Sequence, residues 1–242
     1  SLHTKGEGTG IHIALKKKDV TFTVATSFIS YEQALRNLQY DSHYSSFDEL
    51  KSENERIWNE YLSKIEIDAD EDTLKTFYSC MYRTFLYPHK AYEPDENGKP
   101  IHYSPSADKV LPGVRYTDNG FWDTYRTAWS AYGLFTPTKA TEYLNGLVQH
   151  YKDQGWVPRW IAPGGTNSMV GTSSDVIFAD AMSKGITFDS SDAYKSALRN
   201  AATVSSNLTN GGRNKLNVSN FIGYVPVSGD RESFSWSMEG YI

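Results

Sequence analysis

Apolar residues recur at helical spacing along most of the chain after residue 29. Ser30 and Gln33 stand at capping-box spacing before the first apolar run, and Ser46 and Glu49 repeat this pattern before a longer one. Because residues three and four positions apart share one face of a helix, these runs predict amphipathic helices. Further helices are expected over residues 74–85, 121–135, 137–155, 175–184 and 192–205, and a last one begins near residue 233.

β-Strand patterning is confined to the first residues. Segments 11–15 and 20–28 are rich in β-branched and aromatic residues and flank the polar turn "KKKD", which predicts a hairpin. We expect no strands elsewhere. Residues 88–119 then form a long loop with several prolines, and loops of that length inside a domain are usually functional or disordered.

Composition narrows the classes of function. The 24 Lys and Arg against 29 Asp and Glu give a net charge of -5, so the basic surface that a phosphate backbone requires is missing, and we expect no nucleic-acid partner. No run approaches the ~20 apolar residues of a membrane helix, and we expect no membrane partner. Cys80 is the only cysteine and lies among aromatic residues, which favours a buried structural thiol. Tyr, Phe and Trp form 14% of the chain, which by itself favours core packing over a ligand site.

Carboxylates are the remaining candidates for chemistry. The chain has no G-x-S-x-G, no H-E-x-x-H and no paired C-x-x-C, so triad hydrolases and zinc enzymes have no motif here. In "GFWDTYRT", Asp123 and Arg126 lie one helical turn apart, which is equally typical of an ion pair. The functional alternative is a sugar site, in which Trp122 packs on the ring while Asp123 and Arg126 bind its hydroxyls.

A second candidate lies in "SFSWSMEGYI". Glu239 is surrounded there by Trp236, Met238 and Tyr241. An apolar environment raises the pKa of a carboxylic acid, and a general acid that protonates a leaving-group oxygen needs such a raised pKa. The alternative for Glu239 is an ordinary position on a solvated helix face.

Five ordered blocks resemble one enzyme family. They are "FYSCMYRTFLYP", "GFWDTYRT", "GWVPRWIAPGG", "SMVGTSSDVIFADAMSKGI" and "ESFSWSMEGYI". Together they resemble glycoside hydrolase family 92, the calcium-dependent exo-α-mannosidases. The resemblance implies a mainly α fold, with the last strands of an N-terminal β-sandwich at 1–28, a helical linker at 29–70 and the first part of an (α/α)6 catalytic barrel at 71–242.

The resemblance also implies an activity and its residues. The family removes terminal α-linked mannose from glycans with inversion, and it implies Glu239 as catalytic acid and sugar contacts from Trp122 and Asp123. The catalytic base and the Ca2+ ligands are expected after Ile242. The chain is therefore expected to be part of a longer polypeptide that completes the barrel. In the absence of that remainder, parts of the apolar stripes at 74–85 and 140–151 should lack neighbours.

Two other functions fit the same residues. A non-catalytic carbohydrate-binding or interaction protein on this scaffold would keep Trp122 and Asp123 but would need neither an acid at Glu239 nor a metal. A polysaccharide lyase on an (α/α) toroid would instead need a Tyr or His base. Sequence alone leaves the linkage specificity and the cellular location open.

Overall fold

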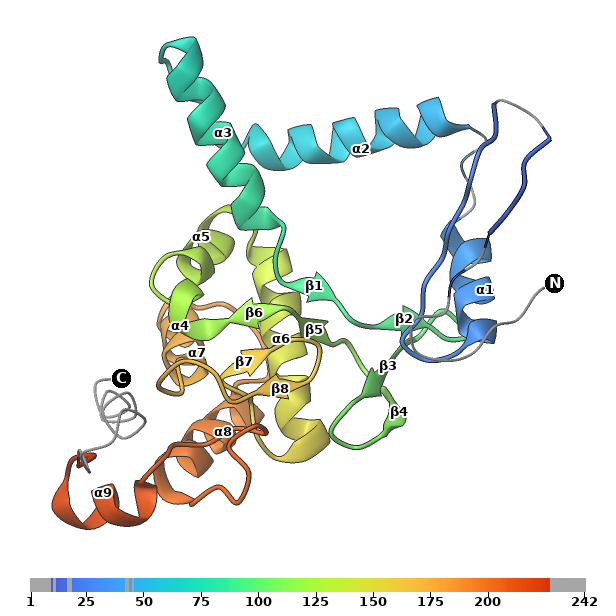
Figure 1. Cartoon of the computed structure of the whole chain (residues 1–242). Coiled ribbons are helices and arrows are strands. Elements are labelled where there is room, and N and C mark those ends of the chain that lie inside the picture. Colours follow the sequence, from blue (N-terminus) through green and yellow to red (C-terminus); the bar gives the residue numbers. More distant parts are fainter. Residues whose placement is uncertain (1–9, 11, 17–18, 42–43, 45, 227–242) are drawn as a thin grey trace.

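The computed structural model in Figure 1 describes residues 10, 12–16, 19–41, 44 and 46–226. The chain is mainly helical, which confirms the predicted class. In order, its helices are α1 (Tyr31–Asp41), α2 (Phe47–Leu62), α3 (Glu71–Phe85), α4 (Phe121–Thr124), α5 (Ala128–Phe135), α6 (Pro137–Gln154), α7 (Ser174–Ser183), α8 (Ser190–Ala202) and α9 (Leu216–Ile222). The strands are β1 (His89–Lys90), β2 (Glu93–Pro94), β3 (Pro100–Ser104), β4 (Lys109–Pro112), β5 (Tyr116–Thr117), β6 (Asn119–Gly120), β7 (Trp160–Ile161) and β8 (Gly165–Thr166).

The predicted capping residues form their bonds. The Ser30 hydroxyl accepts from the Gln33 N–H at 3.1 Å, and the Ser46 hydroxyl accepts from the Glu49 N–H at 3.2 Å. These bonds satisfy N–H groups that have no partner inside the first helical turn. At the C-terminal end of α6, Gly155 takes the left-handed conformation with φ 80°, which a glycine adopts without a steric penalty.

The helix expected over residues 121–135 is two helices. α4 ends at Thr124 and α5 begins at Ala128, because Thr127 leaves the helical region with φ -133° and ψ -47°. The side chains of this turn also bond backward: Thr124 reaches the Gly120 carbonyl, and Arg126 donates to the Trp122 carbonyl. A short, separate helical turn therefore carries the "FWDT" motif.

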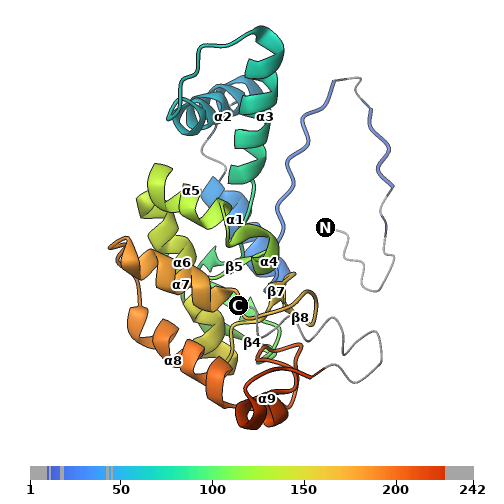
Figure 2. The ribbon, with the colours of Figure 1, turned by 90° about the vertical axis from the view of Figure 1, so that its left-hand side faces the viewer.

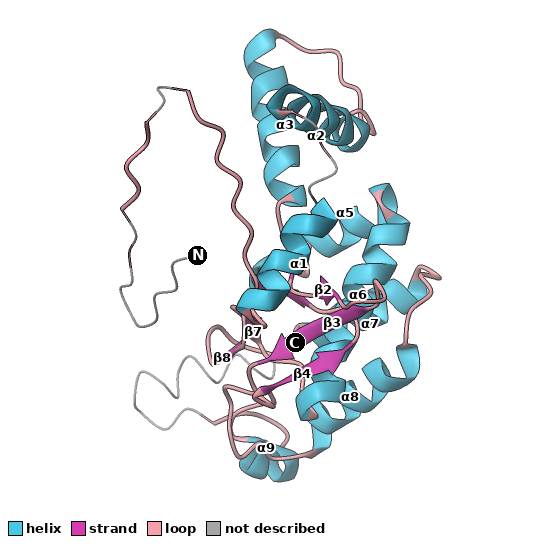
Figure 3. Cartoon of the chain, turned by 90° about the vertical axis from the view of Figure 1, so that its right-hand side faces the viewer, coloured by secondary structure: helices cyan, strands magenta, loops and turns pink. Residues whose placement is uncertain are grey.

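The strands differ most from the prediction. In the described part of the chain, β1 to β6 lie between residues 89 and 120, almost entirely within the predicted loop, and β7 and β8 lie between two predicted helices. They form three small antiparallel sheets ordered β1-β5, β2-β3-β4 and β6-β7-β8, some of whose strands are visible in Figure 3. Most have two residues, which is too short for an alternating pattern to be recognised. The hairpin expected at 11–15 and 20–28 is not formed: the described residues of that segment contain no strand, and Phe22 and Val24 are exposed.

The core surrounds α6. Helices α5, α7 and α8 pack with it into one body, seen from the side in Figure 2. The stripe of α6 expected to lack neighbours is instead buried, because those helices cover it within this chain. The buried residues of α6 are Ala140, Tyr143, Leu144, Gly146, Leu147, Val148 and His150.

Helices α2 and α3 stand away from this body (Figure 1). Their aromatic faces meet, with ring centroids 4.4 Å apart for Trp58 and Tyr82, and the contact continues through Phe85 to Tyr132 in the core. In α3 only Met81 is buried, so the described residues leave much of this stripe without neighbours. Cys80 is exposed on the same helix, which corrects the buried thiol expected from sequence.

Candidate active site

The turn that carries Trp122 and Asp123 rises from a two-residue strand. Asn119 and Gly120 pair with Ile161 and Trp160 of β7. The Trp160 ring lies directly on Gly120, where a Cβ would come within 2.3 Å of a ring atom. Phe121 then enters the core with 1% of its surface exposed. The strand, the packed indole and the buried Phe121 fix the start of α4.

Arg126 is held by aromatic rings. Its guanidinium carbon lies 4.4 Å from the Trp122 ring centroid and 4.4 Å from the Tyr125 ring centroid. Its Nη1 donates to the Trp122 carbonyl at 3.1 Å. Contact of a cation with aromatic faces is favourable, and each such contact contributes about 0.5–1 kcal/mol at an exposed site. One face of the Trp122 indole is therefore occupied by Arg126.

Asp123 takes no part in the contacts that hold Arg126. Its side chain is exposed, and the part of the chain that the structure describes offers it neither a hydrogen bond nor an ion pair. The Asp123–Arg126 ion pair, which was one of the two interpretations of the motif, is not formed. The turn thus presents an unpaired carboxylate beside the half-buried Trp122, an arrangement that suits recognition of a hydroxyl-rich ligand.

The Thr124 hydroxyl bonds the turn to its neighbouring elements. The sequence did not predict this role. Its hydroxyl lies 2.9 Å from Asn119 Oδ1 and 3.0 Å from the Gly120 carbonyl, and it accepts from Trp129 Nε1 at 3.2 Å. The "FWDT" letters carry no signal for this role because the two side-chain partners lie in different elements. Only the fold brings them together.

A buried polar network connects β3 with α6 and with the segment before β5. His102 bonds the Gly113 carbonyl at 3.0 Å and Asp153 Oδ2 at 2.9 Å, and both partners are acceptors. Burial opposes ionisation of Asp153, but hydrogen bonds from His102 and Gln149 outweigh it and lower the pKa of that carboxyl. The network joins β3 to α6 and stabilises the segment that leads into β6.

A second buried carboxyl lies at the start of α7. Burial raises the pKa of Asp175. Its oxygens accept from Thr172 at 2.7 Å and Asn200 at 2.8 Å, and Arg213 Nη2 lies 3.6 Å away. Asp175 is thus fully engaged in joining α7, α8 and the segment before α9, which favours a structural role.

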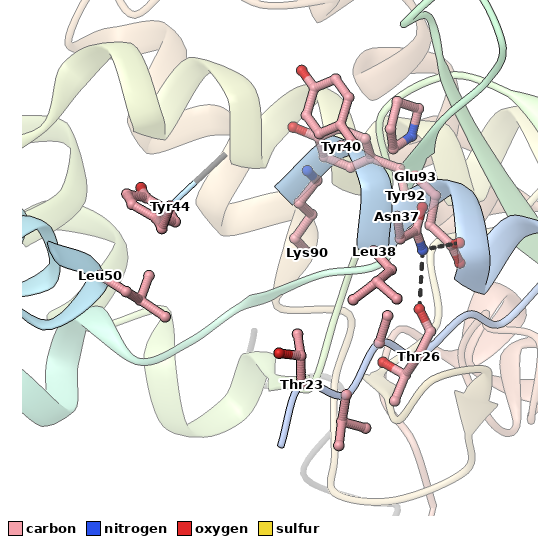
Figure 4. Close-up of a pocket in the computed structure, with 13 residues that line it drawn as sticks. Thr23, Thr26, Asn37, Leu38, Tyr40, Tyr44, Leu50, Lys90, Tyr92 and Glu93 are labelled. Atoms are coloured by element: carbon pink, nitrogen blue, oxygen red, sulfur yellow. Dashed lines mark hydrogen bonds between the residues drawn. The ribbon is translucent and has the colours of Figure 1, made fainter. Parts of the chain in front are cut away.

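A cavity of about 560 Å³ lies between residues 23–26, α1 and the β1–β2 segment (Figure 4), and no residue of the α4 turn lines it. Glu93 joins these parts: its carboxylate accepts from the Phe28 N–H at 2.9 Å and from Asn37 Nδ2 at 2.7 Å. Both Glu93 oxygens therefore hold β2 to residue 28 and to α1. This use of the carboxylate favours a structural role for the residues around the cavity.

Two expected features are not placed by the structure. Glu239 lies outside the described residues, so its position beside Asp123 stays a prediction. Within the described ranges, no three His, Cys, Asp or Glu side chains come together as a metal site. No helix of the described part is long and apolar enough to cross a membrane.

Comparison with known proteins defines the class as a glycoside hydrolase catalytic domain. The model of the glycosyl hydrolase family 92 catalytic domain matches residues 33–242. The chain therefore belongs to glycoside hydrolase family 92. No curated protein sequence matches it.

Solved structures agree with the family. The family GH92 inverting mannosidase BT2199 from Bacteroides thetaiotaomicron VPI-5482 is 33% identical, with a TM-score of 0.78 over 84% of this chain and 28% of that one. The family GH92 α-mannosidase BT3965 from Bacteroides thetaiotaomicron, solved with mannoimidazole, is 24% identical, with a TM-score of 0.73 over 88% of this chain and 27% of that one. At that identity the second likeness concerns the fold alone. The chain spans less than a third of the length of either protein.

Proposed function

We propose that this chain carries part of the active site of a calcium-dependent, inverting exo-α-mannosidase that acts on mannose-containing glycans. The observation that carries the proposal is the match to the family 92 catalytic domain over a segment in which the "FWDT" turn presents the unpaired carboxylate of Asp123. In this proposal residues 29–70 are the linker, and residues 71–242 are the first part of an (α/α)6 barrel.

Each candidate residue has a distinct role. Asp123 binds sugar hydroxyls, and Trp122 supports the sugar ring with the face that Arg126 leaves open. Arg126 orients Trp122 and supplies positive charge at the edge of the site. Glu239 donates a proton to the leaving-group oxygen while a second carboxylate activates water. In inverting enzymes the two carboxyl groups stand roughly 6.5–9.5 Å apart, which leaves room for that water.

Calcium dependence rests on the family alone. A hard cation with open positions would take oxygen ligands such as vicinal sugar hydroxyls. Among the described residues, no three His, Cys, Asp or Glu side chains gather as a metal site. The roles of Asp123, Trp122 and Glu239 are therefore derived without the ion.

The acid role predicts a dependence on the leaving group. In the complete protein, Glu239→Gln should reduce kcat by about 100- to 10,000-fold for a natural disaccharide, because general acid catalysis contributes that much when the leaving oxygen needs a proton. An activated aryl mannoside, whose leaving group departs without a proton, should be affected far less. Steady-state kinetics on both substrates measures the difference.

Asp123→Ala is the comparison variant. It removes sugar positioning and should weaken hydrolysis of both substrates alike. An equal loss on both substrates for Glu239→Gln would argue against the acid role. A wild-type protein that binds mannosides without cleaving either substrate would favour the non-catalytic carbohydrate-binding function.

A further inference from the structure

We propose that Thr124 is a positioning residue that fixes the direction of Asp123 and Trp122 for sugar binding. This inference rests on the proposed function, because it assigns Thr124 a task at the same site. The turn around Thr124 gives three independent observations: the position of its hydroxyl, the weakness of α4 as a helix, and the burial of its partners.

The hydroxyl joins both sides of the turn. It has a single hydrogen, which it donates to Asn119 Oδ1 at 2.9 Å or to the Gly120 carbonyl at 3.0 Å. Its oxygen accepts from Trp129 Nε1 at 3.2 Å. Asn119 lies in β6, before α4, and Trp129 lies in α5, after it. One hydroxyl therefore connects the element that enters the turn to the element that leaves it.

Helix α4 cannot hold this geometry by its own backbone bonds. It has four residues, and its N-cap residue Gly120 has no side chain to cap it. A single helical turn is unstable in isolation because fixing its dihedral angles costs more than its few hydrogen bonds return. The orientation of Trp122 and Asp123 thus depends on side-chain anchors, of which Thr124 is the one adjacent to Asp123.

The partners of Thr124 are buried. Asn119 is 2% exposed and Trp129 is 6% exposed. If the hydroxyl is removed, the Trp129 indole N–H and the Asn119 side-chain oxygen Oδ1 lose their partner at buried positions, so the turn has to move to satisfy them. A displacement of about 1 Å at a group that positions the substrate costs a well-oriented site about 100-fold, and for a group that acts by binding the sugar this cost falls mainly on affinity.

The test uses four forms of the complete protein. Thr124→Val removes the hydroxyl with little change in volume, and Thr124→Ser keeps it. Thr127→Val is the matched control, because Thr127 lies in the same motif, is exposed and makes no side-chain cap bond. Each form is assayed for kcat and KM on an aryl α-mannoside. Binding of methyl α-mannoside is titrated by intrinsic fluorescence, at a temperature well below each unfolding midpoint.

Positioning predicts a specific pattern. Thr124→Val should raise KM and the dissociation constant by about 10- to 100-fold, with a smaller change in kcat. Thr124→Ser should restore both constants to within about threefold, and Thr127→Val should match the wild type. If Thr124→Val fails to fold, Thr124→Ala removes the same hydroxyl and replaces it.

Two outcomes would overturn the inference. One is an unchanged dissociation constant in Thr124→Val. The other is a fall in kcat with KM unchanged that follows the unfolding midpoint, since this would indicate only a smaller folded fraction. The proposed function fails separately, in a wild-type protein that neither cleaves nor binds the mannosides.

Discussion

At the scale of single residues, His150 has a protonation state fixed by its neighbours. Its Nε2 lies 2.8 Å from the Tyr116 carbonyl, so that nitrogen donates, and its Nδ1 then accepts from Arg115 Nη2 at 3.2 Å. Burial, reinforced by the positive charge of Arg115, lowers the pKa of His150 to about 3. The ring is therefore neutral in the folded protein at every pH above that value.

This neutrality predicts acid sensitivity. In the unfolded chain His150 takes up a proton below about pH 6.5, whereas the folded chain takes it up only near pH 3. The contribution to stability is thus fully present above pH 6.5 and is lost as the pH falls. It should amount to about 2–3 kcal/mol between pH 6.5 and pH 4.5, at about 1.4 kcal/mol for each pH unit. Urea unfolding at about pH 7 and about pH 4.5 measures this loss.

His150→Gln is the informative variant. A glutamine amide can donate to the Tyr116 carbonyl and accept from Arg115, but it does not titrate. The variant should fold at neutral pH and should lack this part of the pH dependence. His12→Gln, at an exposed position, serves as the control. The account of His150 is wrong if His150→Gln loses as much stability on acidification as the wild type does.

Asp123, Arg126 and Thr124 show which features of the site could be predicted from sequence and which could not. The spacing of Asp123 and Arg126 left an ion pair and a sugar site open, and the fold removes the first by turning Arg126 onto two aromatic rings. The contacts join residues one and four positions apart, but the same spacing suits an ion pair with Asp123 equally well, so only the structure decides between them. The role of Thr124 was missed because its side-chain partners Asn119 and Trp129 lie in other elements.

At the scale of elements, the packing of β6 against β7 determines where α4 begins. Gly120 has an ordinary extended φ of -98°, so backbone freedom is not the reason for a glycine at this position. The reason is space, since the Trp160 ring occupies the volume in which a Cβ would lie. Trp160 is only half-buried, so the ring is able to move outward under pressure.

Gly120→Ala should therefore disturb both strands. We expect a loss of about 1–3 kcal/mol in the free energy of unfolding, as for other small-to-large changes at packed positions, and a shift of tryptophan emission as Trp160 moves outward. Denaturant unfolding followed by fluorescence measures both. Gly164→Ala is the matched control, because its Cβ would meet Pro105 at an ordinary 3.4 Å. Wild-type stability in Gly120→Ala would contradict the close packing.

Helices were predictable at this scale and strands were not. Ser30, Ser46 and Gly155 mark helix ends by local chemistry that needs no tertiary context. The two-residue strands exist only because distant segments meet, as β1 and β5 do at His89 and Thr117. The alternating segment at 20–28 shows the converse, since its pattern is typical of a strand but the described residues give it no strand partner.

At the scale of the whole molecule, the family match and the helical body agree. Residues 33–242 match the family 92 catalytic domain, and α5 to α8 form the body from which the "FWDT" turn projects. The resemblance in five ordered blocks was enough to predict this membership. It was not enough to place Glu239, because that position depends on residues outside the described part of the chain.

The central claim is that Asp123 and Glu239 serve one bound mannose. The most direct measurement is a crystal structure of the complete protein with a mannose-configured inhibitor. We predict a sugar hydroxyl within about 2.6–3.2 Å of the Asp123 carboxylate. We also predict that the Glu239 carboxyl lies within ~10 Å of Asp123, which is within reach of one bound sugar. A sugar bound away from the α4 turn, or a Glu239 carboxyl well beyond that distance, would contradict the claim.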